Sequence, residues 1–195
     1  NTNAEKPEER SVRFDGIIAG IQSGDIVICQ FHTWNGLKFE RALVEHIKAY
    51  HGRIVIFIHS LEALMIRGSG FMLGETVELY NQAETLIVPS QRMKQFLLDS
   101  GIRNGMKFIV QEMWDWTTGI CFRETPGFQR EIRYIGGADA EFVKDWKYDI
   151  PLRFCTVFRP DELLLELSAG GFGLEWYHDD QAYEYMKYGN SFGVS

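Results

Sequence analysis

The sequence predicts an α/β fold in which two Rossmann-like domains each carry a mainly parallel sheet. Short apolar runs rich in β-branched residues alternate with segments of helical periodicity, which is typical of βαβ units. This alternation breaks at residues 116–127, where turn residues replace any clear period, and it then restarts. We therefore predict an N-terminal domain over residues 1–127 and a partial C-terminal domain over residues 128–195.

In the first domain, apolar runs predict strands and amphipathic segments predict the helices between them. Strands are predicted at residues 26–31, 54–58, 85–88 and 108–110. Helices are predicted at residues 12–21, 39–50, in a segment ending at Tyr80, and at 91–98, with Ser90 as N-cap and Gly101 at the end of the last one. Residues 1–11 are polar and are expected to form a loop or a frayed end. The strands at 26–31 and 54–58 are apolar almost throughout, which indicates burial on both faces.

The second domain repeats this alternation over a shorter length. Strands are predicted at residues 132–135, 152–155 and 172–176, and helices at 141–146, 161–167 and 181–187. This domain holds too few strands to close a core, and the first lacks an opening strand before residue 12. We therefore expect the chain to be part of a longer protein, with further residues at both ends. The alternative is that a partner covers the apolar faces left open.

Composition excludes several classes of protein. The chain has 195 residues, a net charge of -7 and a pI near 5.3, which argues against a general nucleic-acid binder. No apolar span of about 20 residues and no signal-peptide pattern occurs, so a cytoplasmic protein without a membrane span is expected. Cys29, Cys121 and Cys155 lack CxxC or His spacing and are predicted to be buried, reduced thiols.

Two facing Rossmann-like domains suit sugar transfer from a nucleotide donor, which requires stabilisation of a departing diphosphate. No DxD motif is present, and the run from His178 to Asp180 has the wrong spacing for a metal, so no metal or cofactor is expected. The diphosphate charge would instead be held by cationic side chains and helix N-termini. Arg159 stands directly before Pro160, a residue favoured at the first helical position. The alternative for Arg159 is a surface ion pair with Asp161 or Glu162.

A second group of candidates follows the first two strands, where open parallel sheets bind ligands. Trp34 could stack on a sugar while Asn35 hydrogen-bonds its hydroxyls; the alternative is a structural turn with a core tryptophan. His59 could act as a base near neutral pH, or it could be hydrogen-bonded structure, and His32 is a similar, weaker case. The glycines near Phe71 are misplaced for a dinucleotide site, so a mobile loop over a cleft is predicted there.

Short motifs in one order over the whole chain resemble the bacterial glucosyltransferase 3-like proteins and their galactofuranosyltransferase relatives. The motifs are residues 14–20, 24–28, 33–35, 56–59, 88–91, 128–132, 146–152, 159–162 and 170–174. The resemblance implies a GT-B fold, with two domains facing a cleft, a UDP-sugar donor and a homo-oligomer, commonly a tetramer. It implies transfer of glucose or N-acetylglucosamine to O-linked N-acetylglucosamine on serine-rich-repeat adhesins.

The resemblance also implies roles for particular residues. On the nucleotide side it points to Phe158, Arg159, Asn190, Ser191, Gly193 and Ser195. On the acceptor side it points to Trp34, Asn35, Gly36, Arg67, Gly68, Ser69, Gly70 and Phe71. Ser60 stands where the family usually has Asp, and a lysine expected near Gly193 is absent. These departures support an alternative, a non-catalytic member that acts as a protein-binding or assembly subunit. An unrelated doubly wound binding domain is a third possibility.

Overall fold

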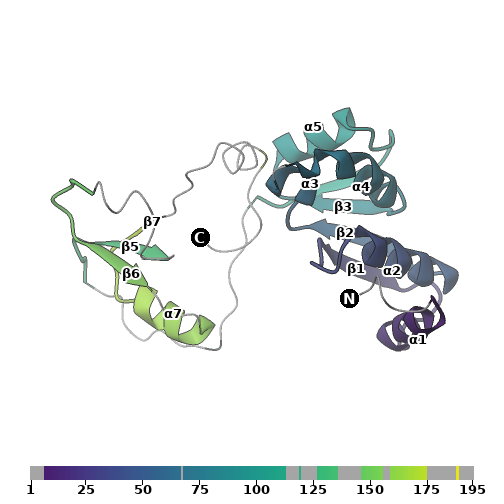
Figure 1. The fold of residues 1–195 in the computed structure, drawn as a ribbon, viewed down its shortest axis with the longest axis horizontal. Helices are drawn as coiled ribbons and strands as arrows, with labels where there is room; N and C mark the ends of the chain where they lie inside the picture. The colour runs from purple at the N-terminus through teal and green to yellow at the C-terminus, as the bar shows by residue number, and fades with distance from the viewer. Residues whose placement is uncertain are drawn as a thin grey trace. The chain divides into compact units, whose positions relative to one another are not determined.

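The computed structural model describes residues 7–66, 68–112, 119, 127–135, 146–155, 159–174 and 188 (Figure 1). Contacts divide the chain into two units. The first contains the described residues up to 112 together with Tyr188, and the second contains those from 119 to 174. Both units are α/β with parallel strands, as the sequence predicts.

The first unit is a parallel sheet with connecting helices. Its elements are α1 (Pro7–Ile17), β1 (Ile26–Phe31), α2 (Leu37–Ala49), β2 (Arg53–Ile58), α3 (Glu62–Met65), the 3-10 helix η1 (Ser69–Met72), α4 (Leu73–Tyr80), β3 (Thr85–Val88), α5 (Gln91–Asp99) and β4 (Lys107–Val110). The strand order is β1-β2-β3-β4. All four predicted strands are confirmed, β1 and β3 with the predicted bounds. The helix predicted over residues 12–21 instead spans Pro7–Ile17, so residues 7–11, predicted as a loop or a frayed end, are helical. Proline and the acidic residues after it suit a helix N-terminus.

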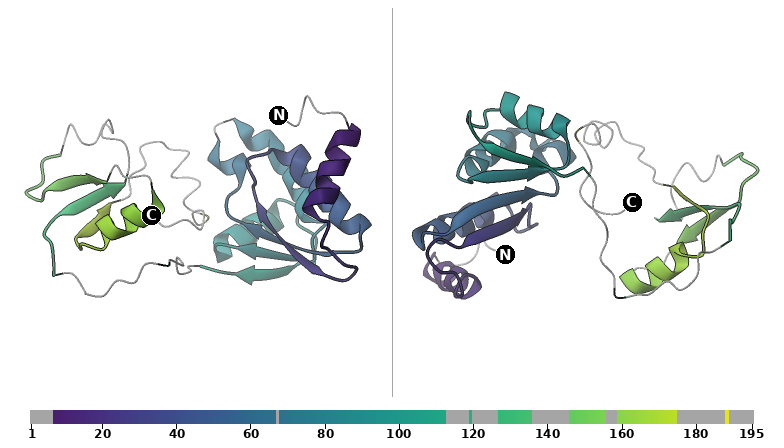
Figure 2. Two further views of the ribbon diagram at one scale, coloured as in Figure 1. Left: turned by 90° about the horizontal axis from the view of Figure 1, so that it is seen from below. Right: turned by 180° about the vertical axis from the view of Figure 1, so that it is seen from behind.

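The core of this unit lies against one face of the sheet. The strand residues in the core cluster share that face, as their register shows: Cys29, Phe31, Ile54, Ile56, Ile58, Leu86 and Val88. The strands lie in the sheet in the same order as in the sequence, so each right-handed crossover runs in the same direction across the sheet. The connecting helices therefore lie on one side of the sheet (Figure 2). The prediction that β1 is buried on both faces is therefore wrong. Ile26 and Ile28 point to the other face and are 60% and 59% exposed.

Ser90 links three segments of the first unit. Its side chain accepts a hydrogen bond from the Met93 backbone N–H at 3.0 Å, which confirms the predicted N-cap of α5. The same hydroxyl donates to the carbonyl of Tyr188. The Tyr188 ring packs on Phe96 with 4.7 Å between centroids. A residue late in the sequence is thus attached to the N-terminal unit.

The two cysteines of the described ranges are free and buried, as predicted for reduced thiols. Burial, with a smaller effect from the nearby Glu40, raises the pKa of Cys29 to about 11. Burial also raises the pKa of Cys155. Both thiols therefore stay protonated near neutral pH, which makes them poor nucleophiles. Cys121 lies outside the described residues.

The second unit has a smaller parallel sheet. Its elements are β5 (Ile132–Ile135), β6 (Leu152–Cys155), α7 (Pro160–Leu167) and β7 (Phe172–Leu174), with strand order β6-β5-β7. β5 and β6 have the predicted bounds, and α7 begins at Pro160 as expected. The predicted helix at 181–187 and most of the one at 141–146 lie outside the described residues.

Two glycines near β7 provide a matched test of packing in this unit. Gly171 has φ +103, and a Cβ there would lie 3.0 Å from the Glu131 carbonyl oxygen. We expect Gly171→Ala to lower the free energy of unfolding by about 1–3 kcal/mol, because positive φ and a backbone contact both oppose a side chain. Gly173 has open space around its Cβ position, so Gly173→Ala should cost less. Urea unfolding of both variants measures the difference, and equal costs would contradict this account.

Candidate functional site

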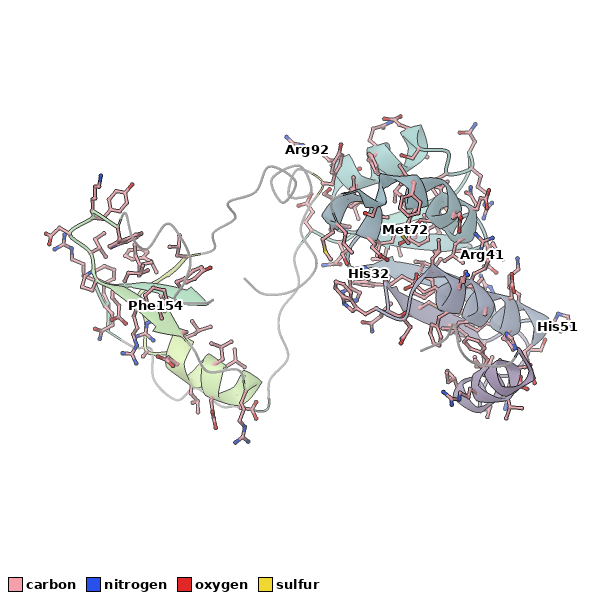
Figure 3. The ribbon with its side chains drawn as sticks, in the orientation of Figure 1. His32, Arg41, His51, Met72, Arg92 and Phe154 are labelled. Carbon is pink, nitrogen blue, oxygen red and sulfur yellow. The ribbon has the colours of Figure 1, made fainter. Side chains whose placement is uncertain are left out.

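The carboxyl ends of β1 and β2 bring two histidines to one edge of the sheet. Phe31 pairs with Ile58 in the parallel register, so His32 and His59 follow on neighbouring strands. Figure 3 shows His32 at one end of the first unit and His51, which precedes β2, at the other. This is the edge at which the sequence predicts a ligand site.

His59 is half-buried and hydrogen-bonded to β1. Its Nε2 lies 2.9 Å from Gln30 Oε1, and its ring lies 4.7 Å from that of Phe57. An amide oxygen can only accept, so this contact places the ring proton on Nε2 and the lone pair on Nδ1. Desolvation, with a smaller contribution from the charge of His32, lowers the pKa of His59. The imidazole is therefore neutral at neutral pH, the form a general base requires.

His32 is held by a different residue. Its Nδ1 lies 2.7 Å from the hydroxyl oxygen of Ser60, which is buried. Its Nε2 is buried and has no hydrogen-bond partner within the described ranges. Ser60 is the residue that replaces the aspartate implied by the resemblance. It thus contacts His32, the histidine that follows β1. Trp34 packs edge-on against the His32 ring with 4.1 Å between centroids.

Trp34 is presented to solvent from the loop between β1 and α2. Its side chain is 72% exposed, so the alternative of a core tryptophan is wrong. Its φ of 61° is uncommon for a bulky residue. Next to it, the Asn35 side chain donates to the Thr33 carbonyl at 3.1 Å, and Gly36 has φ 85° as the N-cap residue of α2. An exposed indole face beside a histidine edge can stack on a sugar ring and still leave room for a base.

The segment predicted as a mobile loop contains the 3-10 helix η1. Ser69 is buried, and its hydroxyl lies 2.7 Å from the Glu62 carbonyl and 2.5 Å from that of Ile66. Its hydroxyl therefore closes a turn that contains the left-handed Gly68. Gly70 and Phe71 lie in η1, and Phe71 is exposed. Of the predicted acceptor-side residues here, Phe71 is the side chain open to a ligand, while Arg67 lies outside the described residues.

In the second unit, Arg159 is the N-cap residue of α7 and Pro160 is at the first helical position. The guanidinium is 81% exposed, and its Nη1 lies 3.1 Å from Glu162 Oε1. An exposed pair of this kind contributes about 0–1 kcal/mol, so a phosphate could displace it. Both alternatives for Arg159 are thus compatible with the structure. The other nucleotide-side candidates, Phe158, Asn190, Ser191, Gly193 and Ser195, lie outside the described residues.

Sequence reasoning missed Glu40, which supports the loop that carries Trp34. Its carboxylate accepts a hydrogen bond from the Thr33 backbone N–H at 2.5 Å and is 3% exposed. Desolvation raises the pKa of Glu40. The signal was available, since Glu40 lies one turn before Val44 on the apolar face of the predicted helix at 39–50.

Two kinds of feature are absent from the described residues. No group of His, Cys, Asp and Glu side chains in those ranges could hold a metal ion. None of the helices there combines the length and hydropathy that a bilayer-spanning segment requires.

Comparison with known proteins identifies the family. Residues 1–113 match the family described as "Glucosyltransferase 3-like, N-terminal domain". The chain is 41% identical to a protein named Glucosyltransferase 3 from Streptococcus parasanguinis, over 94% of this chain and 59% of that protein. It is 31% identical to the protein of the same name from Streptococcus gordonii, over 95% of this chain and 60% of that protein. The chain thus spans about 60% of the length of these relatives. It belongs to the glucosyltransferase 3-like family.

Proposed function

We propose that the chain is part of a metal-independent glycosyltransferase with a GT-B arrangement. It would move glucose or N-acetylglucosamine from a UDP-sugar to O-linked N-acetylglucosamine on a serine-rich-repeat adhesin, in the cytoplasm and as a homo-oligomer. The observation that carries the proposal is the exposed Trp34, which packs against His32, with His59 following the neighbouring strand at the same carboxyl edge of the first sheet, in a chain of this family.

The acceptor half of the proposal rests on this edge. Trp34 supplies an apolar face for the non-reducing sugar, and His59 supplies a neutral imidazole that can take a proton from the acceptor hydroxyl. Removal of that proton generates the nucleophile, which attacks the anomeric carbon as the bond to UDP breaks. Both electrons of the broken bond leave with the UDP oxygen.

The donor half rests on Arg159 and the N-terminus of α7. Departing diphosphate gains negative charge in the transition state, and a guanidinium with backbone N–H groups at a helix N-terminus suits that charge. These groups do not require a divalent cation. EDTA is therefore expected to leave the transfer rate unchanged.

A transfer assay on the full-length protein tests the proposal. Radiolabelled UDP-glucose and UDP-N-acetylglucosamine would be supplied with a serine-rich peptide that carries O-linked N-acetylglucosamine, with and without EDTA. The expected result is label on the glycosylated peptide and none on the unmodified peptide. No transfer from either donor would reject the enzymatic assignment, and loss of transfer in EDTA would reject metal independence.

Trp34→Ala is expected to weaken acceptor binding. Losing the indole face should raise the KM for the glycosylated peptide by about tenfold or more, equivalent to about 1.4 kcal/mol, with a smaller effect on the donor KM. Tyr50→Ala is the control, because this exposed aromatic lies at the opposite edge of the sheet, after α2. Equal KM values for the two variants would remove Trp34 from the acceptor site.

One observation favours a second candidate function, a non-catalytic binding or assembly subunit. Ser60 is engaged with His32 and carries no charge that could support a positive His59. Calorimetric titration of the full-length protein with UDP separates the two possibilities. Heat of binding at a single site supports the enzyme, whereas no heat and no thermal shift would favour the subunit.

A further inference from the structure

Glu40 holds the loop at residues 33–36 at both of its ends. The carboxylate accepts from the Thr33 backbone N–H at 2.5 Å, and the Glu40 backbone N–H donates to the Gly36 carbonyl at 3.2 Å. The side chain is 3% exposed, at the start of α2. One buried residue therefore ties both the entry and the exit of this loop to the first turn of a helix.

The loop contains a backbone conformation that needs such support. Trp34 has φ 61°, which is unfavourable for a large side chain and persists only where surrounding contacts impose it. Thr33 is the centre of those contacts. Besides its bond to Glu40, its hydroxyl accepts from the Asn35 backbone N–H at 3.4 Å, and its carbonyl accepts from the Asn35 side chain at 3.1 Å. The position of the indole thus depends on Thr33, and Thr33 is fixed to the core by Glu40.

The surroundings of Glu40 do not otherwise account for a carboxyl group there. Within the described ranges no lysine or arginine pairs with it, and the nearby Glu62 is of like charge. A carboxyl group in this position is costly to bury, and a leucine would fill the same core without that cost. What the carboxylate supplies is an acceptor for the Thr33 N–H, next to the exposed Trp34.

We propose that Glu40 is a positioning residue for sugar-acceptor binding, acting through Thr33 to hold Trp34 in its exposed orientation. This inference rests on the proposed function, because it assigns Trp34 to the acceptor. Glu40 does not touch the acceptor. Its effect is expected in the acceptor KM and in the environment of the Trp34 ring.

Two substitutions at Glu40 distinguish positioning from general stability. Glu40→Leu removes the acceptor oxygen and keeps an apolar filler, while Glu40→Gln keeps an acceptor oxygen in nearly the same shape. Val44→Ala is the matched control, since Val44 lies one turn later on the same buried face of α2 and has no bond to the loop. The full-length protein would be labelled with 5-fluorotryptophan, and the Trp34 resonance identified by its absence in Trp34→Phe.

The fluorine spectrum and the acceptor KM are then compared across the variants. We expect Glu40→Leu to shift or broaden the Trp34 resonance and to raise the acceptor KM about tenfold, with the donor KM unchanged. Glu40→Gln should keep the Trp34 resonance and the acceptor KM of the unmodified protein. Val44→Ala should leave the Trp34 resonance unchanged. An unchanged resonance in Glu40→Leu would overturn the proposal, as would a changed resonance with an unchanged KM. If the unmodified protein transfers no sugar, the proposed function fails by itself, and the resonance still decides whether Glu40 holds Trp34.

Discussion

Arg133→Met is expected to unfold the second unit selectively, with a loss of about 3–5 kcal/mol, because it removes one partner of a buried ion pair. Arg133 is buried on β5 and forms an ion pair with Glu131, and it also donates to the carbonyl of Glu166 in the last turn of α7. A methionine would leave a carboxylate and a helix-end carbonyl without this donor. Hydrogen exchange of peptides covering β5 and β6 measures the effect, which should be about a hundredfold faster exchange or more.

A neighbouring arginine provides the control. Arg153 forms an ion pair with the side chain of Glu166, whose backbone carbonyl accepts from Arg133. Arg153 Nη2 lies 2.9 Å from Glu166 Oε1, but the Arg153 side chain is half-exposed. Arg153→Met should therefore cost about 0–1 kcal/mol. The double variant Arg133→Met/Glu131→Leu should recover part of the loss, since it removes both charges of the pair. Equal costs for the two single variants would show that burial does not determine the contribution of this network.

His59→Gln is expected to reduce kcat about 10²–10⁴-fold, the usual contribution of a general base, with a small change in the acceptor KM. Glutamine keeps a polar group near Gln30 but cannot take a proton. His51→Gln is the matched control, because His51 is an exposed histidine in the turn at the opposite edge of the sheet. If His59→Gln reduces kcat by less than about threefold, His59 is not the general base.

The pH profile adds a second readout for His59. Its pKa lies below the ordinary 6.5, chiefly because the ring is desolvated, so the neutral base persists as the pH falls through 6.5. The acid limb of kcat/KM is expected below pH 6.5 rather than at it. The sign for stability follows from the same shift. The unfolded chain binds the proton more tightly, so the contribution of His59 to stability is present above pH 6.5 and is lost as the pH falls toward its lowered folded pKa. A limb above pH 6.5 would contradict both statements.

Local features of this protein could be predicted from the sequence because they depend on residues close together in the chain. The strands at 85–88, 132–135 and 152–155 follow from short runs rich in apolar residues between turn residues. The cap at Ser90 follows from one hydroxyl placed before a helical period. The family follows from motifs in order along the chain, which do not depend on contacts.

Contacts across the sheet could not be predicted in the same way. The sequence of β1 reads as buried on both faces, but the order β1-β2-β3-β4 sends successive crossovers to one side, and Ile26 and Ile28 are exposed on the other. Whether a face of a strand is buried depends on which side of the sheet the connecting helices lie. The sequence of the strand alone does not determine that side.

The candidate site shows the same division. Sequence alone determined that His32, Trp34 and His59 follow two parallel strands, since strand ends can be located from local patterns. Only the tertiary structure decided that His59 pairs with Gln30, that His32 pairs with Ser60, and that Trp34 faces solvent. Only the structure shows that Glu40 supports this loop, because α2 places its carboxylate within hydrogen-bond distance of the Thr33 backbone N–H. Hydrogen-bond partners are set by strand register and helix placement, which bring together residues that are distant in the chain.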